Sequence, residues 1–321
     1  MLKRFLIFLF IAITFTACNG QPPAVSAQEE RYIMQEERFT IIPESPRPGD
    51  PITIAANTNE KEALLIVNDR QVGKAQFFDV PAVGRNPGFR AAVITLPAST
   101  AVQNAVIKMV NHSGSIIEIP FTITPREFRS ETLTFSAAVS NLVNEPNPER
   151  VREAERLWAI WNTTGDQIYH SGNFMLPVTS TRRTSPFGFR RTNIYTDGKR
   201  TSSVHMGIDF GIPTGTEVFA CARGRVVLSR SRILTGFTVV LEHAPGIYTM
   251  YYHLDSVTAE EGSIVETGEV IGLSGATGMV TGPHLHWELR INGEFADPDV
   301  FVERPLIDKA LIISRLGSIR P

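Results

Sequence analysis

The sequence contains seven histidines, and four of them fall in three short motifs after residue 200. The motifs are HMGID with His205 and Asp209, MYYHLD with His253, and PHLHWEL with His284 and His286. Zinc sites in hydrolases typically combine three histidine or carboxylate ligands with a fourth position for water. His205, Asp209 and one histidine of HLH satisfy that count. The motifs therefore predict a zinc site with proton-transfer groups beside it.

The spacing within the motifs limits how these residues can share one ion. In a strand, positions i and i+2 face the same side about 7 Å apart, so His284 and His286 face one site. One of them is expected to bind the metal while the other transfers protons. An extended chain would separate His205 from Asp209 by about 13 Å, which is too far for one ion. We expect Gly207 to let the chain bend between them.

Some of these residue types have structural explanations instead. His243 in LEHAPG stands alone, and we interpret it as a structural histidine. The four clustered histidines each have a glycine, a proline or a turn nearby, which favours access over burial. Cys221 in VFACARG is expected to be a small buried hydrophobic residue rather than a nucleophile.

Glycine-punctuated strands must position the histidine motifs. From Met175 onward the strand patterns are VFACARGRVVLSR, FTVVLEH, YTMYYHLD, EVIGLSG and HLHWELR. They show no long amphipathic helix. We therefore predict a compact antiparallel β domain over residues 175–303, partly open or barrel-like. Its C-terminus is predicted to be free of helix, with a tail over residues 304–321.

A second β-rich region, residues 38–125, precedes this domain. Short strand patterns such as EALLIVND and RAAVITLP alternate there with turn signals such as PRPGD and HSGS. Their spacing predicts an all-β sandwich that resembles an immunoglobulin-like domain. Its single histidine, His112, lies in a predicted turn, and the region is expected to be a spacer or docking module. The predicted fold class of the whole chain is all-β and mainly antiparallel.

The linker between the two β regions, residues 126–174, is predicted to contain one amphipathic helix. Asn147 can act as its N-cap, and Pro148 suits the first helical position. The face expected to pack on a neighbouring domain comprises Val151, Ala154, Trp158 and Trp161. Two alternatives stay open. The tryptophans could stack on a sugar, and residues 128–173 could cover the groove of the site until they are displaced.

The first residues have the layout of an export signal. Two basic residues precede an apolar stretch over residues 5–15, which is shorter than the ~20 residues that span a bilayer. Residues 1–17 are the predicted signal peptide, and the polar, Pro-rich residues 18–37 are a predicted tether. Cys18 after a small residue resembles a bacterial lipobox. We expect a lipidated Cys18 that anchors an exported, periplasmic or cell-surface protein to a membrane; the alternative is an ordinary cleaved signal.

Length and composition agree with an exported globular protein. A chain of 321 residues exceeds one average domain, so two domains are expected. A net charge of -2 with 20% charged residues is ordinary globular usage, and nucleic acid is not an expected partner. Cys221 is the only other cysteine, so a chain lipidated at Cys18 would have no intramolecular disulfide.

The order of motifs resembles a known enzyme family. HMGIDF, PTGTEVFACARGRV, YTMYYHL, EVIGLSGATG, TGPHLHWEL and ADP follow one another between residues 187 and 298. Together they are similar to the lysostaphin-type, LytM-like zinc metallopeptidases that cleave peptides in bacterial peptidoglycan. The β-rich region and the helix before them resemble the longer exported members of that family.

The resemblance implies a role for each residue of the cluster. His205, Asp209 and His286 match the ligands of one zinc per chain. His253 and His284 match the catalytic pair, with His284 expected as the general base and His253 as the group that stabilises the oxyanion. The implied reaction is hydrolysis of a peptide bond by a water that zinc activates.

Two functional hypotheses follow. The first is an endopeptidase acting on peptidoglycan peptides, and a membrane-tethered protein remodelling its own wall favours a D,D-endopeptidase. The second is a non-catalytic protein that binds the cell wall or activates an amidase, as members of the family that lost ligands do. No ligand position is substituted in this sequence, which favours the enzyme.

Overall fold

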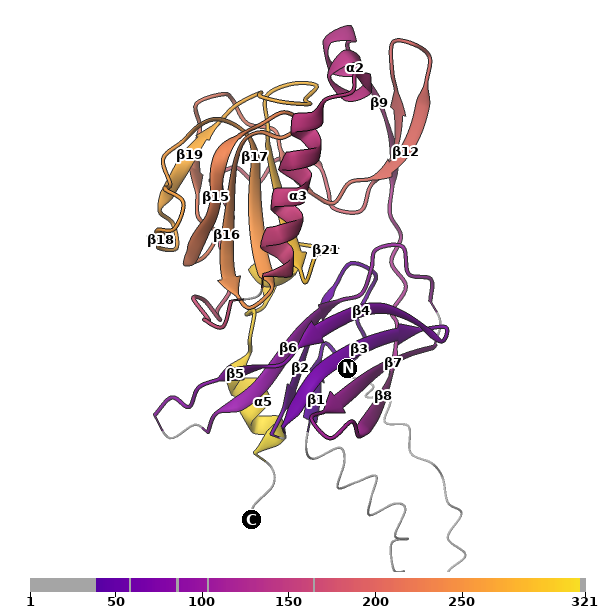
Figure 1. The fold of residues 1–321 in the computed structure, drawn as a ribbon, viewed down its shortest axis with the longest axis vertical. Helices are drawn as coiled ribbons and strands as arrows, with labels where there is room; N and C mark the ends of the chain where they lie inside the picture. The colour runs from indigo at the N-terminus through magenta and orange to yellow at the C-terminus, as the bar shows by residue number, and fades with distance from the viewer. Residues whose placement is uncertain (1–38, 58, 85–86, 103, 164, 318–321) are drawn as a thin grey trace, which may run out of the picture. The chain divides into compact units, whose positions relative to one another are not determined.

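The computed structural model describes residues 39–317, apart from residues 58, 85–86, 103 and 164 (Figure 1). Antiparallel strands dominate these residues, as predicted. Residues 37–321 are assigned to one compact unit. The predicted signal peptide, the tether and Cys18 lie outside the described residues. None of the described helices has the length and apolar character required to cross a bilayer.

Two four-stranded antiparallel sheets form the N-terminal part. One has the order β1 (Phe39–Ile42), β2 (Pro51–Ala56), β6 (Phe89–Thr95) and β5 (Phe78–Val80). The other has the order β4 (Arg70–Gln76), β3 (Glu60–Val67), β7 (Asn104–Asn111) and β8 (Ile116–Thr122). Alternate side chains of the two sheets form one apolar cluster that includes Ile54, Leu65 and Ile107. His112 lies in the turn after β7, as predicted.

The first of these sheets is buried on both faces. All six residues of β2 are buried. A strand with one face in solvent would instead alternate buried and exposed residues. Phe78, Phe89 and Val93 belong to the same apolar cluster as Phe210 and Trp287 from the C-terminal part. The hydrophobic core is therefore continuous from this sheet into the sheet that bears the histidine motifs.

The sheet that bears the histidine motifs has ten strands, and its main path runs β10-β13-β20-β17-β16-β15-β18. The bounds of these seven are β10 (Arg183–Ser185), β13 (Gly207–Phe210), β20 (Leu285–Ile291), β17 (Ile247–Val257), β16 (Gly236–Ala244), β15 (Gly224–Arg232) and β18 (Ile264–Val265). Three further strands pair beside the path: β14 (Glu217–Phe219), β19 (Val270–Ser274) and β21 (Glu294–Ala296). All pairings in this sheet are antiparallel.

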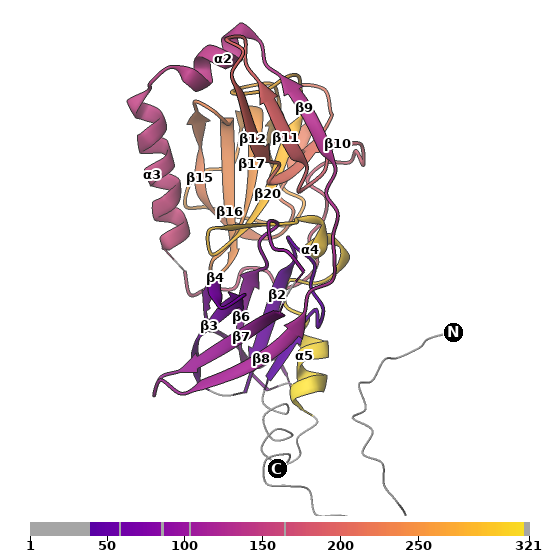
Figure 2. The same ribbon diagram turned by 90° about the vertical axis from the view of Figure 1, so that its right-hand side faces the viewer.

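A separate three-stranded sheet stands beside the ten-stranded one (Figure 2). Its order is β12 (Arg200–Val204), β11 (Arg190–Ile194) and β9 (Ser130–Thr134). β9 comes from the linker and pairs in parallel with β11. The linker continues into α2 (Ala137–Asn144), a helix that sequence analysis missed, whose N-cap is Ser136.

The predicted helix of the linker is present as α3 (Pro148–Asn162). Asn147 is its N-cap, accepting from the N–H of Glu149 at 2.9 Å, and Pro148 occupies the first turn. Leu157 and Trp161 pack on β15, β16 and β17. The predicted buried face was wrong for its other members, because Val151 is 59% exposed, Trp158 is 57% exposed and Ala154 is exposed.

The true contact face of α3 contains charged residues, which hid it from a hydrophobicity pattern. Glu153 lies one turn before Leu157 and accepts the N–H of Ile233 at 3.0 and 3.1 Å. Arg150 lies one turn earlier and donates to the carbonyl of Val143 at 2.7 Å. Hydrogen bonds of charged side chains, as well as apolar contacts, therefore determine which face of α3 packs against the protein.

The prediction of a helix-free C-terminus was wrong, and the segment predicted as a tail over residues 304–321 contains a helix. Two short helices, α4 (Asp299–Glu303) and α5 (Lys309–Leu316), end the described chain. Asp308 caps α5 by accepting the N–H of Leu311 at 2.9 Å. Ile312 and Leu316 are buried in the continuous core. Helices of this length present too few turns for a periodic signal, so tertiary packing decides their formation.

Candidate metal and proton-transfer site

The register of three neighbouring strands brings the histidine motifs together. In the β13–β20 pair, Asp209 is directly opposite His286. In the β20–β17 pair, His286 is directly opposite Tyr252, and the two rings stack at 5.4 Å between centroids with 4° between their planes. Directly paired residues in a sheet have adjacent side chains. The strand pairing alone therefore fixes the neighbours of His286.

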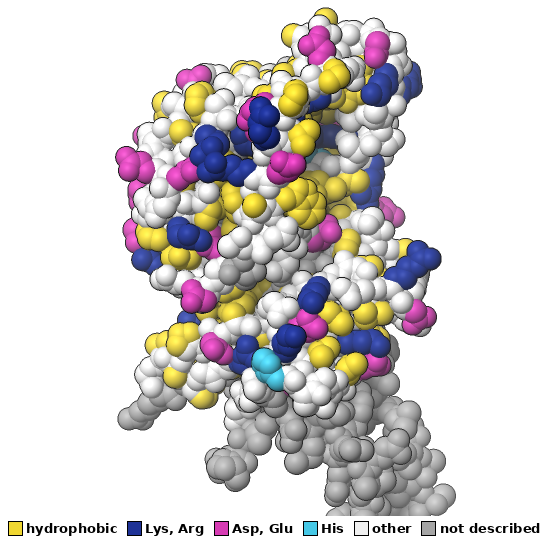
Figure 3. All heavy atoms as spheres, in the orientation of Figure 1, with side chains coloured by type: hydrophobic (Ala, Val, Ile, Leu, Met, Phe, Trp, Pro, Cys, Tyr) yellow, Lys and Arg dark blue, Asp and Glu magenta, His cyan; other side chains and the backbone are white. Residues whose placement is uncertain are grey.

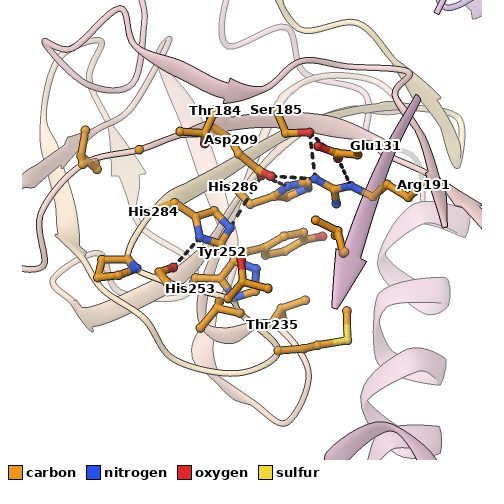
Figure 4. A pocket seen from close by; sticks show the side chains of 18 of the residues that line it. Glu131, Thr184, Ser185, Arg191, Asp209, Thr235, Tyr252, His253, His284 and His286 are labelled. Carbon is orange, nitrogen blue, oxygen red and sulfur yellow. Dashed lines mark hydrogen bonds and ion pairs between the residues drawn. The ribbon is translucent and has the colours of Figure 1, made fainter. Parts of the chain in front are cut away.

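His205, Asp209 and His286 converge on one point. The Nε2 atom of His205 lies 3.0 Å from Oδ1 of Asp209 and 3.0 Å from Nδ1 of His286. Nδ1 of His286 lies 2.7 Å from the same Oδ1. Three ligand atoms that each bond to one zinc ion at about 2.0–2.2 Å must lie within about 4 Å of one another. The distances between these three atoms satisfy that condition. The geometry is that of a three-ligand metal site. Figure 4 shows two of the three residues, Asp209 and His286.

The two histidines among these side chains are each oriented by a second partner. Nδ1 of His205 donates to the carbonyl of Pro186 at 2.9 Å, and Nε2 of His286 contacts Oε2 of Glu288 at 3.4 Å. These contacts leave Nε2 of His205 and Nδ1 of His286 as the atoms that face the site. Glu288 is itself held by Nε of Arg290 at 2.7 Å. The donor set fits zinc because each facing atom is one that a metal can use.

The electrostatics of the site favour a bound cation. Burial lowers the pKa of His205, and it would by itself lower that of His286. Hydrogen bonds to Asp209 and to Glu288 instead raise the pKa of His286 to about 9. Burial would raise the pKa of Asp209, but its hydrogen bonds to the two histidines keep that pKa well below the ordinary value. Two carboxylates thus act on one buried imidazole, which is the environment of a cation-binding site.

His253 reaches the site through an unusual backbone conformation. Tyr252 already faces His286, so regular alternation along β17 would turn His253 to the other side of the sheet. His253 has a φ of 61°, a region that residues other than glycine rarely adopt, and its N–H donates to the carbonyl of Thr235 at 2.7 Å. The ring lies 4.8 Å from that of His284 between centroids. Strained backbone is typical of functional positions, and here it aims the ring at the site.

The hydrogen bonds of His253 and His284 define which ring atom each presents. Nδ1 of His253 donates to the carbonyl of Thr277 at 2.8 Å, and Nδ1 of His284 donates to the carbonyl of Gly282 at 2.8 Å. In the neutral state each ring therefore presents the lone pair of Nε2. Burial lowers the pKa of His253 to about 3, so this ring is neutral near pH 7. Both rings thus present the same kind of atom, and which of them acts as the general base stays a prediction.

A cavity of about 760 Å³ opens onto these residues. One wall of it comes from the linker, because Glu131, Leu133 and Phe135 line the cavity together with the histidines. Figure 4 shows Glu131 on its strand reaching toward Arg191, which in turn reaches toward Asp209. The corresponding distances are 2.5 Å from Nε of Arg191 to Oε1 of Glu131 and 2.9 Å from Nη2 to Oδ2 of Asp209.

Gly207 has a different role from the predicted one. His205 and Met206 lie between β12 and β13 outside any strand, and Gly207 is the first residue of β13. A Cβ atom at Gly207 would lie 2.4 Å from the carbonyl oxygen of Trp287 and 2.8 Å from the ring of His286. Glycine is required there because backbone and ligand ring approach closely.

Sequence analysis missed three residues that hold the ligands in place. Glu288 stands two positions after His286 in HLHWE, and its i, i+2 spacing on one strand was the available signal. Arg191 and Glu131 carried no such signal, since Glu131 is 60 residues from Arg191 along the chain and Arg191 is 18 residues from Asp209, on a different strand. The two structural interpretations hold. His243 is fully buried between the carbonyl of Arg223 and the hydroxyl of Thr249, and burial raises the pKa of Cys221 to about 12.

Comparisons with known proteins agree with this site. Residues 203–298 match the family model described as Peptidase family M23. The chain is 42% identical over 135 residues to the DD-carboxypeptidase/endopeptidase Mpg of Neisseria meningitidis, covering 42% of this chain and 30% of that protein. It is 43% identical over 118 residues to the peptidoglycan DD-endopeptidase ShyA of Vibrio cholerae, covering 36% of this chain and 27% of that protein.

The matched region spans less than a third of the length of these curated relatives. A crystal structure from Pseudomonas aeruginosa, described as a candidate peptidase M23, superposes with a TM-score of 0.55 at 24% identity. It covers 80% of this chain and 94% of that one, so the likeness in fold extends beyond the matched motifs. The strands that carry the converging histidines and aspartate lie within the matched region, and the chain therefore carries a domain of peptidase family M23.

Proposed function

We propose that this protein is a zinc-dependent endopeptidase that hydrolyses D,D peptide bonds in the crosslinks of peptidoglycan. The observation that carries the proposal is the convergence of His205, Asp209 and His286, with His253 and His284 beside them in one cavity. The names of the relatives, DD-carboxypeptidase/endopeptidase and peptidoglycan DD-endopeptidase, support this choice of substrate.

In this proposal, His205, Asp209 and His286 hold one zinc ion. The ion would supply Lewis acidity toward water and the peptide carbonyl. His253 and His284 move the protons: one Nε2 takes a proton from the attacking water, and the other donates to the carbonyl oxygen as charge develops there. The water oxygen bonds to the carbonyl carbon, the C–N bond breaks, and the leaving amine takes a proton. The ring that takes the proton of the water can pass it to that amine, and a ring that donates to the carbonyl oxygen does so while it carries a proton on Nε2.

The location of the substrate agrees with the export signal in the sequence. We infer that residues 1–17 are removed and that a lipidated Cys18 tethers the enzyme to a membrane facing the wall. Labelling cells with a radioactive fatty acid would test this, with Cys18→Ala as the matched control. Absence of label on the wild type would leave an ordinary cleaved signal.

The central experiment measures zinc content and muropeptide cleavage on the mature chain. Wild type should hold about one zinc and shorten crosslinked dimers in mass spectra. His205→Ala should lose the metal, whereas His284→Gln and His253→Gln should keep metal and fold but lose nearly all turnover. His243→Gln, which alters a buried histidine outside the cavity, is the matched control.

The competing hypothesis is a non-catalytic wall-binding or amidase-activating protein. It becomes the leading one if wild type holds zinc and folds but leaves every crosslinked dimer intact. In that case His284→Gln should also keep its cellular role, because no turnover would be lost.

A further inference from the structure

The cavity contains one cation that no other charged group neutralises. Among the described residues that line it, Glu131, Arg191 and Asp209 pair with one another, and Glu288 pairs with Arg290. Arg182 also lines the cavity, its side chain is exposed, and it forms no ion pair with any described residue. Its hydrogen bond from Nη1 to the carbonyl of Gly211 is long, at 3.5 Å. The guanidinium therefore keeps donors free for a ligand.

The strand pairing brings Arg182 near the metal ligands. Ser185 of β10 is paired with Asp209 of β13, the register shifts between Arg183 and Ser185, and just beyond the paired strands the N–H of Gly211 donates to the carbonyl of Arg182 at 3.3 Å. Arg182 and Asp209 line the same cavity.

Gly211 lies beneath the side chains of Arg182 and Thr184. A Cβ atom at Gly211 would lie 2.5 Å from Cγ2 of Thr184, which is a clash, and 3.4 Å from Nη1 and 3.6 Å from Cζ of Arg182, which are ordinary contact distances. The guanidinium therefore lies against the backbone of Gly211 in the wall of the cavity, where its planar donors are open to a ligand.

We propose that Arg182 binds the free carboxylate of the residue that follows the cleaved bond. This inference rests on the proposed peptidase function. In a peptide ending in D-alanyl-D-alanine, that residue carries the terminal carboxylate. In a crosslink to the D-centre of a diamino acid, it carries a carboxylate on the carbon that bears the cleaved amide nitrogen. One carboxylate-binding position therefore serves both carboxypeptidase and endopeptidase cleavage, and it selects D,D bonds over internal peptide bonds that lack this charge.

The distances are compatible with that assignment. Consecutive Cα atoms are 3.8 Å apart, so a carboxylate one residue beyond the cleaved carbonyl lies roughly 3–4 Å from it. A bidentate guanidinium–carboxylate pair adds N···O distances of about 2.7–2.9 Å. These lengths together reach about 7 Å, roughly the length of two residues of extended chain, which is the sequence separation of Asp209 and Gly211.

The test compares two stem peptides that differ in one group. One ends in D-alanyl-D-alanine with a free carboxylate, and the other ends in the corresponding carboxamide. Zinc-loaded wild type should cleave the carboxylate peptide with a kcat/KM roughly 10- to 100-fold higher than that for the carboxamide peptide. The difference should come chiefly from a lower KM for the carboxylate peptide. Arg182→Gln should remove that preference, Arg182→Lys should keep part of it, and Arg223→Gln, a surface arginine outside the cavity, should keep all of it.

Equilibrium binding of the same two peptides to the metal-free full chain separates this proposal from the peptidase function. Tighter binding of the carboxylate peptide by wild type, lost in Arg182→Gln, supports the carboxylate position even if no peptide is cleaved. Equal binding and equal cleavage of both peptides by wild type overturn it while the peptidase function stands. An unchanged preference in Arg182→Gln also overturns it.

Discussion

Arg191 donates from Nη2 to Oδ2 of Asp209 at 2.9 Å, which leaves Oδ1 as the oxygen that meets the two histidines. A carboxylate with one oxygen held in this way has a fixed orientation toward a metal. Arg191 is itself fixed by Glu131 and by the hydroxyl of Ser185 at 2.9 Å. The position of a proposed zinc ligand therefore depends on a strand of the linker.

The first prediction concerns zinc affinity. Arg191→Met should raise the dissociation constant for zinc by roughly 10- to 100-fold, because Asp209 loses the partner that orients it. Competition with a fluorescent chelator measures this constant directly. Arg230→Met removes an arginine that pairs with Glu261 outside the cavity and should leave the constant unchanged. Equal affinities in wild type and Arg191→Met would show that the ion pair does not position the ligand.

The second prediction concerns the close approach at Gly207. Gly207→Ala should destabilise the fold by roughly 1–3 kcal/mol or more, because the added Cβ meets the Trp287 carbonyl, which belongs to the paired backbone and cannot rotate away. It should also weaken zinc binding, since the same Cβ meets the ring of His286. Urea unfolding of the metal-free chain measures the first effect. Gly282→Ala is the control, since a Cβ there would meet no atom within 4 Å.

The third prediction concerns pH and the buried His243. Burial lowers its pKa from the ordinary 6.5 to about 4, so between these values the unfolded chain binds a proton that the folded chain does not. Stability contributed by neutral His243 is therefore complete above pH 6.5 and is lost as pH falls toward 4. At pH 4.5 the loss is roughly 2–3 kcal/mol. The stability measurement should use metal-free protein, because acid would also release zinc and thereby destabilise the fold.

His243→Gln supplies the comparison. At pH 7 the variant should be the less stable protein, because the ring fills a buried site and bonds Thr249 at 2.7 Å. The difference should shrink on acidification, since glutamine does not titrate. A stability difference that stays constant between pH 7 and pH 4.5 would contradict the assignment of a neutral, buried imidazole.

The fourth prediction addresses whether the linker covers the groove. Glu131 in β9 pairs with Arg191 at the cavity wall, so Glu131→Gln should loosen this wall and raise kcat/KM on bulky crosslinked fragments several-fold. Cleavage of a short stem peptide should change less. Zinc affinity must be measured beside it, because Arg191 also contacts Asp209. Equal rates on bulky substrate at equal zinc content would remove the idea of a covering linker.

A chain truncated near Asn173 is a poorer test of the same idea. It would remove α3, whose Leu157 and Trp161 cover apolar side chains of β15, β16 and β17. It would also leave β11 without its partner β9. Loss of activity in such a chain would reflect exposed core and an unpaired edge.

The histidine motifs allowed the site to be placed from the sequence because strand geometry is local. The i, i+2 spacing of His284 and His286 and the spacing of His205 and Asp209 are properties of one strand and one bend. The antiparallel fold class was also confirmed, since it depends on alternation and turn residues that the sequence displays. The ligand roles themselves stay predictions until metal is measured.

The features that sequence analysis missed depend on contacts between distant segments. The positive φ of His253, the partner Arg191 of Asp209 and the parallel pairing of β9 with β11 leave no periodic trace. The face of α3 predicted to be buried included Trp158, because hydrophobicity outweighs charge in a helical pattern, whereas Glu153 and Leu157 make contacts there. The C-terminal helices were missed because they are too short for a periodic signal and their burial comes from tertiary packing, in which α5 lies against β1.

Side chains of Phe78, Phe89 and Val93 share one core with the strands that bear the site. The amide of Asn292 also donates to the carbonyl of Val93 at 2.8 Å. A division of the chain near residue 125 would cut through this core, leaving each piece with apolar surface that the other normally removes from water. The N-terminal sheets and the sheet that bears the histidine motifs are thus expected to melt together in a single transition, so the N-terminal β region sets the temperature at which the site is lost.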